Sequence, residues 1–147
     1  MIFGIIGYGS IGQRHVRNLI ALGYKDIVLL RKIGSGNNYD LKEFTEIKEF
    51  LGSEPDVVII ANPTNLHAEF LTQILSLDIN VLVEKPLVAT IEEWQSLQDQ
   101  LLNYDGIGMT AYNMRFHPSV SETQKIITED KIGKIYSARF FVGQYLP

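Results

Sequence analysis

The feature of this sequence that most constrains its fold is a glycine-rich turn directly after a short apolar run. Residues 2–6, Ile-Phe-Gly-Ile-Ile, are the kind of continuous apolar stretch that forms a buried parallel strand. Gly-Tyr-Gly-Ser-Ile-Gly follows at residues 7–12, and residues 10–22 then carry apolar side chains at helical spacing. A G-x-G-x-x-G turn between a strand and a helix is typical of a βαβ unit that binds a dinucleotide.

The three glycines of this turn have separate predicted roles. Gly7 permits the tight turn, Gly9 lets the backbone approach a pyrophosphate, and Gly12 allows the helix to pack closely on the strand. The free N–H groups and partial positive charge at the start of the helix would attract the phosphates. The alternative is a glycine-rich turn that binds no ligand.

Strands and helices alternate along the rest of the chain. Further strands are predicted at residues 27–30, 41–44, 56–61, 81–83 and 107–111, and helices at 46–51, 66–77, 90–102 and 118–128. The helix at 90 opens with a capping box, in which Thr90 and Glu93 satisfy each other's free backbone donors. This order predicts an α/β fold, a doubly wound parallel (Rossmann) sheet of about six strands. Residues 135–142 predict one more strand, with no helix after it, as at the start of a truncated C-terminal α+β domain.

Composition narrows the function classes. The chain has 147 residues, 46% of them apolar and 20% charged, as in ordinary soluble globular proteins. The net charge of −4, without a basic block, argues against nucleic acid as the main partner. The lack of cysteine excludes disulfides and thiolate metal sites, and no metal site is predicted. No apolar run approaches the ~20 residues that span a bilayer, and no signal peptide fits before the first strand, so we expect a cytoplasmic protein without membrane contact.

The end of the second strand bears on which dinucleotide fits. An NAD site usually has an acidic residue about 20 residues past the glycine turn. Here the strand ends at Leu30 and is followed by Arg31 and Lys32, with no acid. Two cations would attract a 2′-phosphate, and arginine can bind it through two N–H groups. The sequence therefore favours NADP, with NAD possible; the alternative is that the pair forms a solvated turn.

Polar residues follow two later strands, where ligands bind in open α/β sheets. They are Asn62, Pro63, Thr64 and His67 after the strand that ends at Ala61, and Glu84 and Lys85 after residues 81–83. Lys85 could bond a substrate hydroxyl and lower its pKa, or pass a proton. Structural alternatives are a His67 bonded to backbone in the first helical turn, and a surface Lys85 paired with Glu84.

Taken together, these residues resemble the glucose–fructose oxidoreductase / inositol dehydrogenase / rhizopine catabolism (Gfo/Idh/MocA) family. The resemblance covers almost the whole chain, and its motifs are the glycine turn with His15, Ala61-x-Pro63 with Leu66-His67, Glu84-Lys85-Pro86, and Asn113-x-Arg115-Phe116-x-Pro118. It implies transfer of a hydride between NAD(P) and a hydroxyl or carbonyl of a small-molecule substrate. That substrate is expected to be a carbohydrate: a sugar, cyclitol or nucleotide sugar.

The resemblance also implies roles for single residues. Lys85 becomes the catalytic lysine beside the nicotinamide, Glu84 holds Lys85 or the nicotinamide amide, Pro86 follows a cis bond, and His15 packs. The full predicted cofactor-binding set is Gly7, Tyr8, Gly9, Ser10, Ile11, Gly12, Arg31, Lys32, Ala61, Asn62, Pro63, Thr64, His67, Glu84, Lys85, Asn113 and Arg115.

Members of this family are usually much longer than this chain. Their C-terminal half binds the substrate, supplies a catalytic histidine and often forms the dimer. The resemblance thus implies an NAD(P)-binding Rossmann domain at residues 1–118. Residues 119–147 become the linking helix and first strand of an otherwise absent substrate domain. We expect these residues alone to bind cofactor without appreciable turnover, and the full-length form to be a homo-oligomer. A non-catalytic dinucleotide sensor is the rival interpretation.

Overall fold

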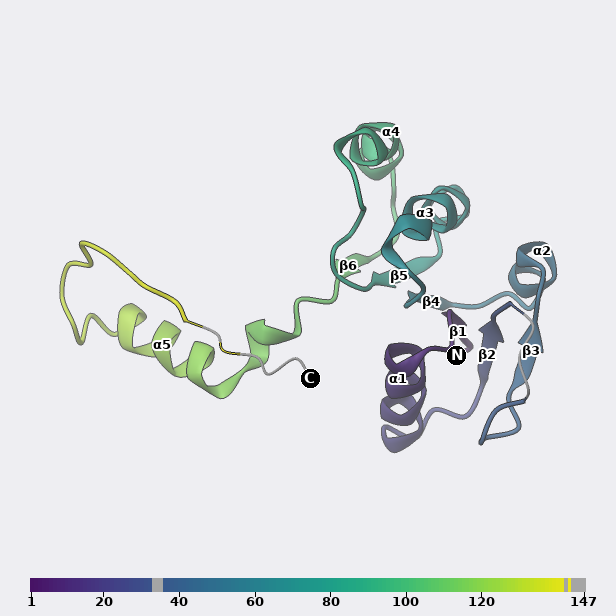
Figure 1. The fold of residues 1–147 in the computed structure, drawn as a ribbon, viewed down its shortest axis with the longest axis horizontal. Coiled ribbons are helices and arrows are strands. Elements are labelled where there is room, and N and C mark those ends of the chain that lie inside the picture. Colours follow the sequence, from purple (N-terminus) through teal and green to yellow (C-terminus); the bar gives the residue numbers. More distant parts are fainter. Residues whose placement is uncertain (33–35, 142, 144–147) are drawn as a thin grey trace. The chain divides into compact units, whose positions relative to one another are not determined.

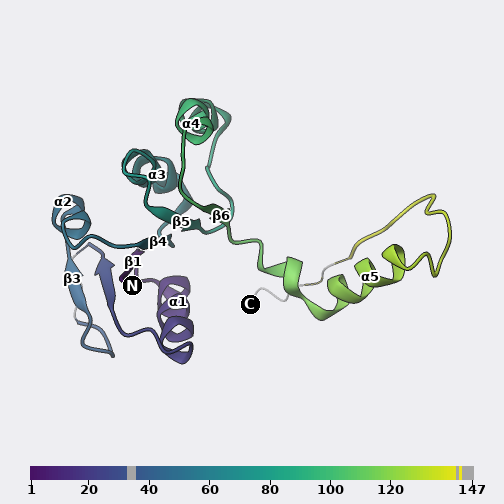
Figure 2. The same cartoon turned by 180° about the vertical axis from the view of Figure 1, so that it is seen from behind.

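The computed structural model describes residues 1–32, 36–141 and 143. By internal packing the chain forms two units, residues 1–111 and 112–147, and each is described by itself. The division falls before the boundary predicted at residue 118. Figures 1 and 2 show the elements from opposite sides.

The first unit is a six-stranded parallel sheet with the strand order β3-β2-β1-β4-β5-β6. The strands are β1 (Phe3–Ile6), β2 (Ile27–Leu30), β3 (Lys42–Phe44), β4 (Val57–Ile60), β5 (Asn80–Val83) and β6 (Gly108–Thr110). The helices are α1 (Ser10–Ala21), α2 (Ile47–Leu51), the 3-10 helix η1 (Thr64–Leu66), α3 (His67–Leu75) and α4 (Ile91–Leu102). The order reverses between β1 and β4, as in doubly wound dinucleotide-binding sheets, which confirms the predicted fold class.

Helices cover both faces of this sheet (Figures 1 and 2). On one face, strand residues such as Ile5 and Leu29 pack with Val16 of α1. On the other face, residues such as Ile6 and Ile60 form a larger core with side chains of α2, α3 and α4. Because successive strand residues point to opposite faces, a strand buried on both must be apolar throughout. This explains the uninterrupted apolar runs in the sequence.

The strand ends are level with one another where the predicted site lies. Ile6, the last residue of β1, pairs in register with Leu30 of β2 and with Ile60 of β4. Ile60 in turn pairs with Val83, the last residue of β5. The turns that follow these four strands therefore leave the sheet at one common edge, as the sequence predicted.

The helix predicted to begin at Thr90 is confirmed together with its capping box. The Thr90 hydroxyl accepts the Glu93 N–H at 3.2 Å, and the Glu93 carboxylate accepts the Thr90 N–H at 3.3 Å. The helix predicted over 66–77 is shorter, because η1 precedes it and α3 ends at Leu75. Among the described residues, no helix is both long and apolar enough to cross a membrane.

The second unit contains the 3-10 helix η2 (Asn113–Phe116) and α5 (Pro118–Thr128). Pro118 is the first residue of α5, as predicted, and the ring nitrogen Nδ1 of His117 accepts the Ser119 N–H at 3.2 Å. The strand predicted over 135–142 does not form at residues 135–141, and residue 142 lies outside the described residues. A segment with strand-forming side chains becomes a strand only when a neighbouring backbone pairs with it.

Candidate active site

Two glycines of the turn between β1 and α1 leave no room for a side chain. Gly7 has a φ of +90°, and a Cβ there would lie 2.7 Å from the backbone nitrogen of Asn62. A Cβ at Gly12 would lie 2.0 Å from the Gly7 carbonyl oxygen. Gly7 therefore makes the tight turn beside β4, and Gly12 lets α1 sit directly on it, as the sequence predicted.

Gly9 differs from its two neighbours. Its φ of −73° is open to any residue, and a Cβ there would meet none of the described residues within 4 Å. Gly9 is the N-cap of α1, whose first turn has neither a capping side chain nor an acidic residue. The start of α1 is thus exposed and its first N–H groups have no side-chain cap, which is what a pyrophosphate needs in order to approach the backbone.

A cavity of about 570 Å³ opens beside the turn. Its lining comes from the ends of β1, β2, β3 and β4, from the start of α2, and from η1 and α3: Gly7, Tyr8, Leu30, Arg31, Lys32, Thr45, Glu46, Ile47, Asn62, Pro63, Leu66, Glu69 and Phe70. The volume lies within the roughly 300–1,000 Å³ of small-molecule sites. The cavity combines apolar walls with two cations, Arg31 and Lys32, and two carboxylates, Glu46 and Glu69, so it suits the adenosine half of a dinucleotide.

The Asn62 side chain marks this cavity as a binding site. Its amide nitrogen and oxygen are both buried, and neither has a hydrogen-bond partner in the part of the chain that the structure describes. Buried polar atoms nearly always have a partner, so an orphaned amide in a cavity wall indicates that a ligand or water completes it. The residues present thus fit a dinucleotide.

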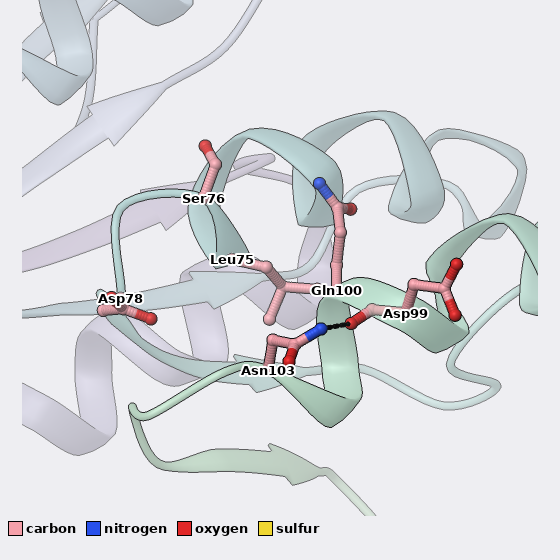
Figure 3. Close-up of a pocket in the computed structure, with 6 residues that line it drawn as sticks. All are labelled: Leu75, Ser76, Asp78, Asp99, Gln100 and Asn103. Carbon is pink, nitrogen blue, oxygen red and sulfur yellow. Dashed lines mark hydrogen bonds between the residues drawn. The ribbon is translucent and has the colours of Figure 1, made fainter.

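A second cavity, of about 370 Å³, lies between α3 and α4 (Figure 3). Its lining is Leu75, Ser76, Asp78, Asp99, Gln100 and Asn103. Asp78 precedes β5, so this cavity lies toward the amino end of that strand, away from the glycine turn. Ligands of open α/β sheets bind at the carboxyl ends of the strands, and the candidate site is therefore the cavity beside the glycine turn.

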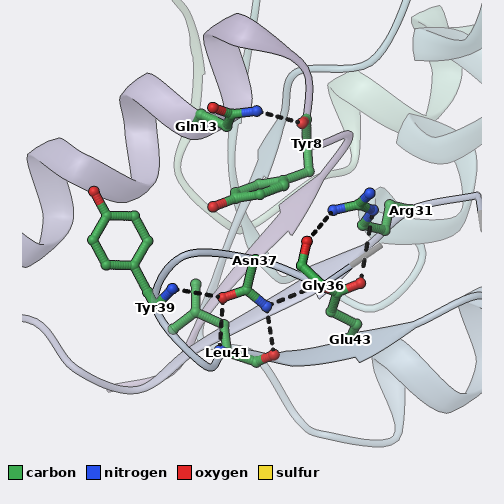
Figure 4. Close-up of polar contacts among 8 residues, drawn as sticks. All are labelled: Tyr8, Gln13, Arg31, Gly36, Asn37, Tyr39, Leu41 and Glu43. Atoms are coloured by element: carbon green, nitrogen blue, oxygen red, sulfur yellow. Dashed lines mark hydrogen bonds and ion pairs between the residues drawn. The ribbon is translucent and has the colours of Figure 1, made fainter. Parts of the chain in front are cut away.

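Arg31 pairs with an acid that the sequence analysis missed. Its Nε lies 3.7 Å from a carboxylate oxygen of Glu43 on β3, and its guanidinium lies 5.4 Å from the centre of the Tyr8 ring (Figure 4). Burial raises the pKa of the Tyr8 phenol, as do the nearby Tyr39 and Glu43, while Arg31 opposes them. This acid does not follow the second strand, where NAD sites usually carry one; it lies on β3, whose register sets Glu43 opposite Leu29.

Lys85 follows β5 at the same edge, and its side chain is exposed. The Lys85–Pro86 peptide bond is cis, as the resemblance implied. Glu84 does not pair with the Lys85 ammonium group: one carboxylate oxygen lies 2.8 Å from His15 Nε2, and the other accepts the Lys85 backbone N–H at 3.3 Å. His15, predicted only to pack, therefore anchors Glu84 to α1, and the surface-pair alternative for Lys85 is not supported.

His67 has the structural role that the sequence analysis kept as its alternative. The side chain is buried, with a relative exposure of 1%. Its Nδ1 lies 3.0 Å from the Pro86 carbonyl oxygen and its Nε2 lies 3.0 Å from that of Asn62. His67 therefore ties the turn after β4 to the turn that carries Lys85.

The sequence of this unit matches a known family. Residues 1–112 match the Gfo/Idh/MocA oxidoreductase family, described as having an NAD-binding Rossmann fold. The chain belongs to this family. It is 38% identical to levoglucosan dehydrogenase of Pseudarthrobacter phenanthrenivorans over 165 residues, which cover 97% of the chain and 40% of that protein. It is 34% identical to the NADP-dependent D-xylose 1-dehydrogenase of Haloarcula marismortui over 79 residues, 54% of the chain and 22% of that protein.

A solved structure of the family has the same fold. Myo-inositol 2-dehydrogenase from Lactobacillus plantarum superposes with a TM-score of 0.83 at 26% identity, over 92% of the chain and 43% of that protein. The chain thus spans less than half the length of these Gfo/Idh/MocA relatives.

The remaining predicted residues fall into three places. Ser10 and Ile11 open α1 next to Gly9, and Ala61, Pro63 and Thr64 form the turn after β4. Asn113 and Arg115 lie in η2 of the second unit, and their part in cofactor binding stays a prediction.

Proposed function

We propose that the chain is the dinucleotide-binding part of an NAD(P)-dependent oxidoreductase acting on a hydroxyl or carbonyl of a sugar, cyclitol or nucleotide sugar. The observation that carries this proposal is the glycine turn, in which Gly7 and Gly12 are closed to any side chain and Gly9 opens onto free space. The names of the relatives support the substrate class, because levoglucosan, xylose and myo-inositol are polyhydroxylated rings or sugars.

In this proposal each part of the edge binds a different part of the dinucleotide. The start of α1 holds the pyrophosphate, since its N–H groups and dipole favour anions. The cavity beside the turn holds the adenosine half, with Arg31 and Lys32 at its rim. These two cations favour a 2′-phosphate, so NADP is the preferred form and NAD the second.

Lys85 acts at the other end of the site. The nicotinamide ring, when bound, gives or accepts the hydride; the protein binds, orients and moves protons. The Lys85 ammonium donates a hydrogen bond to the reacting oxygen of the substrate and lowers the pKa of the hydroxyl. Glu84 holds the backbone N–H of Lys85, and His67 holds the carbonyl of Pro86, so the segment that carries the ammonium is fixed on both sides.

Titration of the chain with NADPH and with NADH, followed by nicotinamide fluorescence, tests the binding part. Tighter binding of NADPH supports both the site and the role of the basic pair. Equal or NADH-favoured binding keeps the site but shows that Arg31 and Lys32 give no preference for a 2′-phosphate. If neither nucleotide binds, the proposal fails.

Lys85→Ala, measured in the whole protein, separates an enzyme from a dinucleotide sensor. We expect loss of turnover with dinucleotide binding retained, because Lys85 contacts the substrate rather than the phosphates. Lys48→Ala, which removes an exposed cation from α2, is the matched control and should leave turnover unchanged. Full activity in Lys85→Ala would favour the sensor.

A further inference from the structure

Arg31 is held by three separate segments. Its Nε lies 3.7 Å from the Glu43 carboxylate on β3, and Nη1 donates a hydrogen bond to the Gly36 carbonyl at 3.2 Å. The third contact is with the Tyr8 ring of the glycine turn (Figure 4). The side chains of Arg31 and Glu43 are only 20% and 23% exposed, so water screens this ion pair less than it would a surface pair.

Glu43 is itself held in place. Asn37 Nδ2 donates to the other Glu43 carboxylate oxygen at 2.8 Å and to the Leu41 carbonyl at 2.9 Å. Asn37 Oδ1 accepts the N–H groups of Leu41 at 2.8 Å and of Tyr39 at 3.1 Å. The amide of Asn37 thus closes residues 37–41 into a loop that fixes the carboxylate against Arg31.

This arrangement limits what Arg31 offers to a ligand. A strong grip on phosphate uses two parallel N–H groups and the full guanidinium charge. Here Nε is directed to Glu43 and one N–H of Nη1 already has an acceptor, so the side of the guanidinium with Nε is occupied, and a carboxylate offsets the charge. A dianionic 2′-phosphate loses attraction to such a site, whereas the uncharged 2′-hydroxyl of NAD is nearly unaffected.

We infer that Glu43 sets the preference between NADP and NAD by partly neutralising Arg31, so that both forms are accepted. This inference rests on the proposed dinucleotide site. It gives a specificity-determining role to an acid on β3, in place of the acid that NAD sites carry after their second strand.

Glu43→Gln tests the inference, because the amide keeps an oxygen for Asn37 and removes only the charge. Removing the unit charge that lies 3.7 Å from Arg31 Nε should lower the Kd for NADPH about fivefold to tenfold, and change that for NADH less than about twofold. Glu43→Ala should shift the ratio in the same direction. Glu49→Gln, at an exposed site on α2, changes the net charge equally and should leave the ratio unchanged.

A double-mutant cycle shows whether the effect acts through Arg31. In the Arg31→Ala background, Glu43→Gln should no longer improve NADPH binding. Weaker NADPH binding in Glu43→Gln, an unchanged ratio, or an improvement that persists without Arg31 overturns the inference. These outcomes differ from failure of the proposed function, in which the unmodified chain binds neither nucleotide. Urea unfolding of each variant confirms that the fold is retained.

Discussion

Replacing Gly9 by alanine should separate binding from stability. Gly9 has an ordinary φ, and the added methyl meets no atom of residues 1–32, 36–141 or 143 within 4 Å, so the fold should be unchanged or about 0.4–1 kcal/mol more stable. The methyl would project into the space assigned to the pyrophosphate. Losing one or two charged-group hydrogen bonds, each worth about 1.5–3 kcal/mol, weakens binding by at least tenfold.

Gly12→Ala is the matched substitution in the same turn. Its primary effect should be on the stability of the fold rather than on binding. Its methyl would lie 2.0 Å from the Gly7 carbonyl oxygen, a backbone atom that cannot rotate away. Overpacking of this kind costs about 1–3 kcal/mol, which corresponds to a Tm lower by roughly 3–12 °C for a chain of this size.

The two variants are compared in one pair of assays, urea unfolding followed by circular dichroism and NADPH titration followed by fluorescence. We expect Gly9→Ala to keep the wild-type urea midpoint but to bind NADPH more weakly, and Gly12→Ala to unfold at a lower urea concentration. Wild-type affinity in Gly9→Ala would refute the assignment of this space to a phosphate. A wild-type midpoint in Gly12→Ala would refute the packing argument.

Three further predictions concern single side chains. Thr90→Ala removes the capping box and should lower the free energy of unfolding by about 0.5–2 kcal/mol in urea unfolding. His67→Leu removes the ring nitrogens that lie 3.0 Å from the Asn62 and Pro86 carbonyl oxygens, and should cost about 1–3 kcal/mol in the same assay; no change would show that the ring contacts are not stabilising. Burial raises the pKa of Tyr104, whose hydroxyl donates to the Ile79 carbonyl at 2.6 Å. Its contribution is complete below the unfolded pKa of about 10 and is lost as the pH rises through the folded pKa, so Tyr104→Phe should flatten the alkaline fall in stability.

The fold was predictable because strand and helix signals in the first 111 residues are local. Continuous apolar runs predicted β1, β2, β4 and β5, and the capping box fixed the start of α4. The prediction for residues 135–142 did not hold at 135–141, because a strand also needs a pairing partner, and side-chain pattern does not report one.

The site was predictable in position but not in its contacts. Strand ends locate the edge, since parallel strands in register end together. The pairing of Arg31 with Glu43, and of His15 with Glu84, joins residues far apart in the chain, and no local spacing encodes it. The sequence did carry one indirect signal for Glu43. It pairs with Leu29 in the sheet, and Leu41, two residues earlier and just before β3, packs against the same core as Leu29.

The contacts also divide the motif residues into two kinds. Gly7 and Gly12 act by having no side chain. His15 and His67 instead contact other motif residues, Glu84 and Pro86. Both histidines act on the turn that carries Lys85, one through Glu84 and one through Pro86. A motif residue of this second kind should affect how the lysine is oriented more than how tightly the phosphates bind. The motifs of this chain therefore include residues that fix the geometry of the strand ends, besides those proposed to contact the dinucleotide.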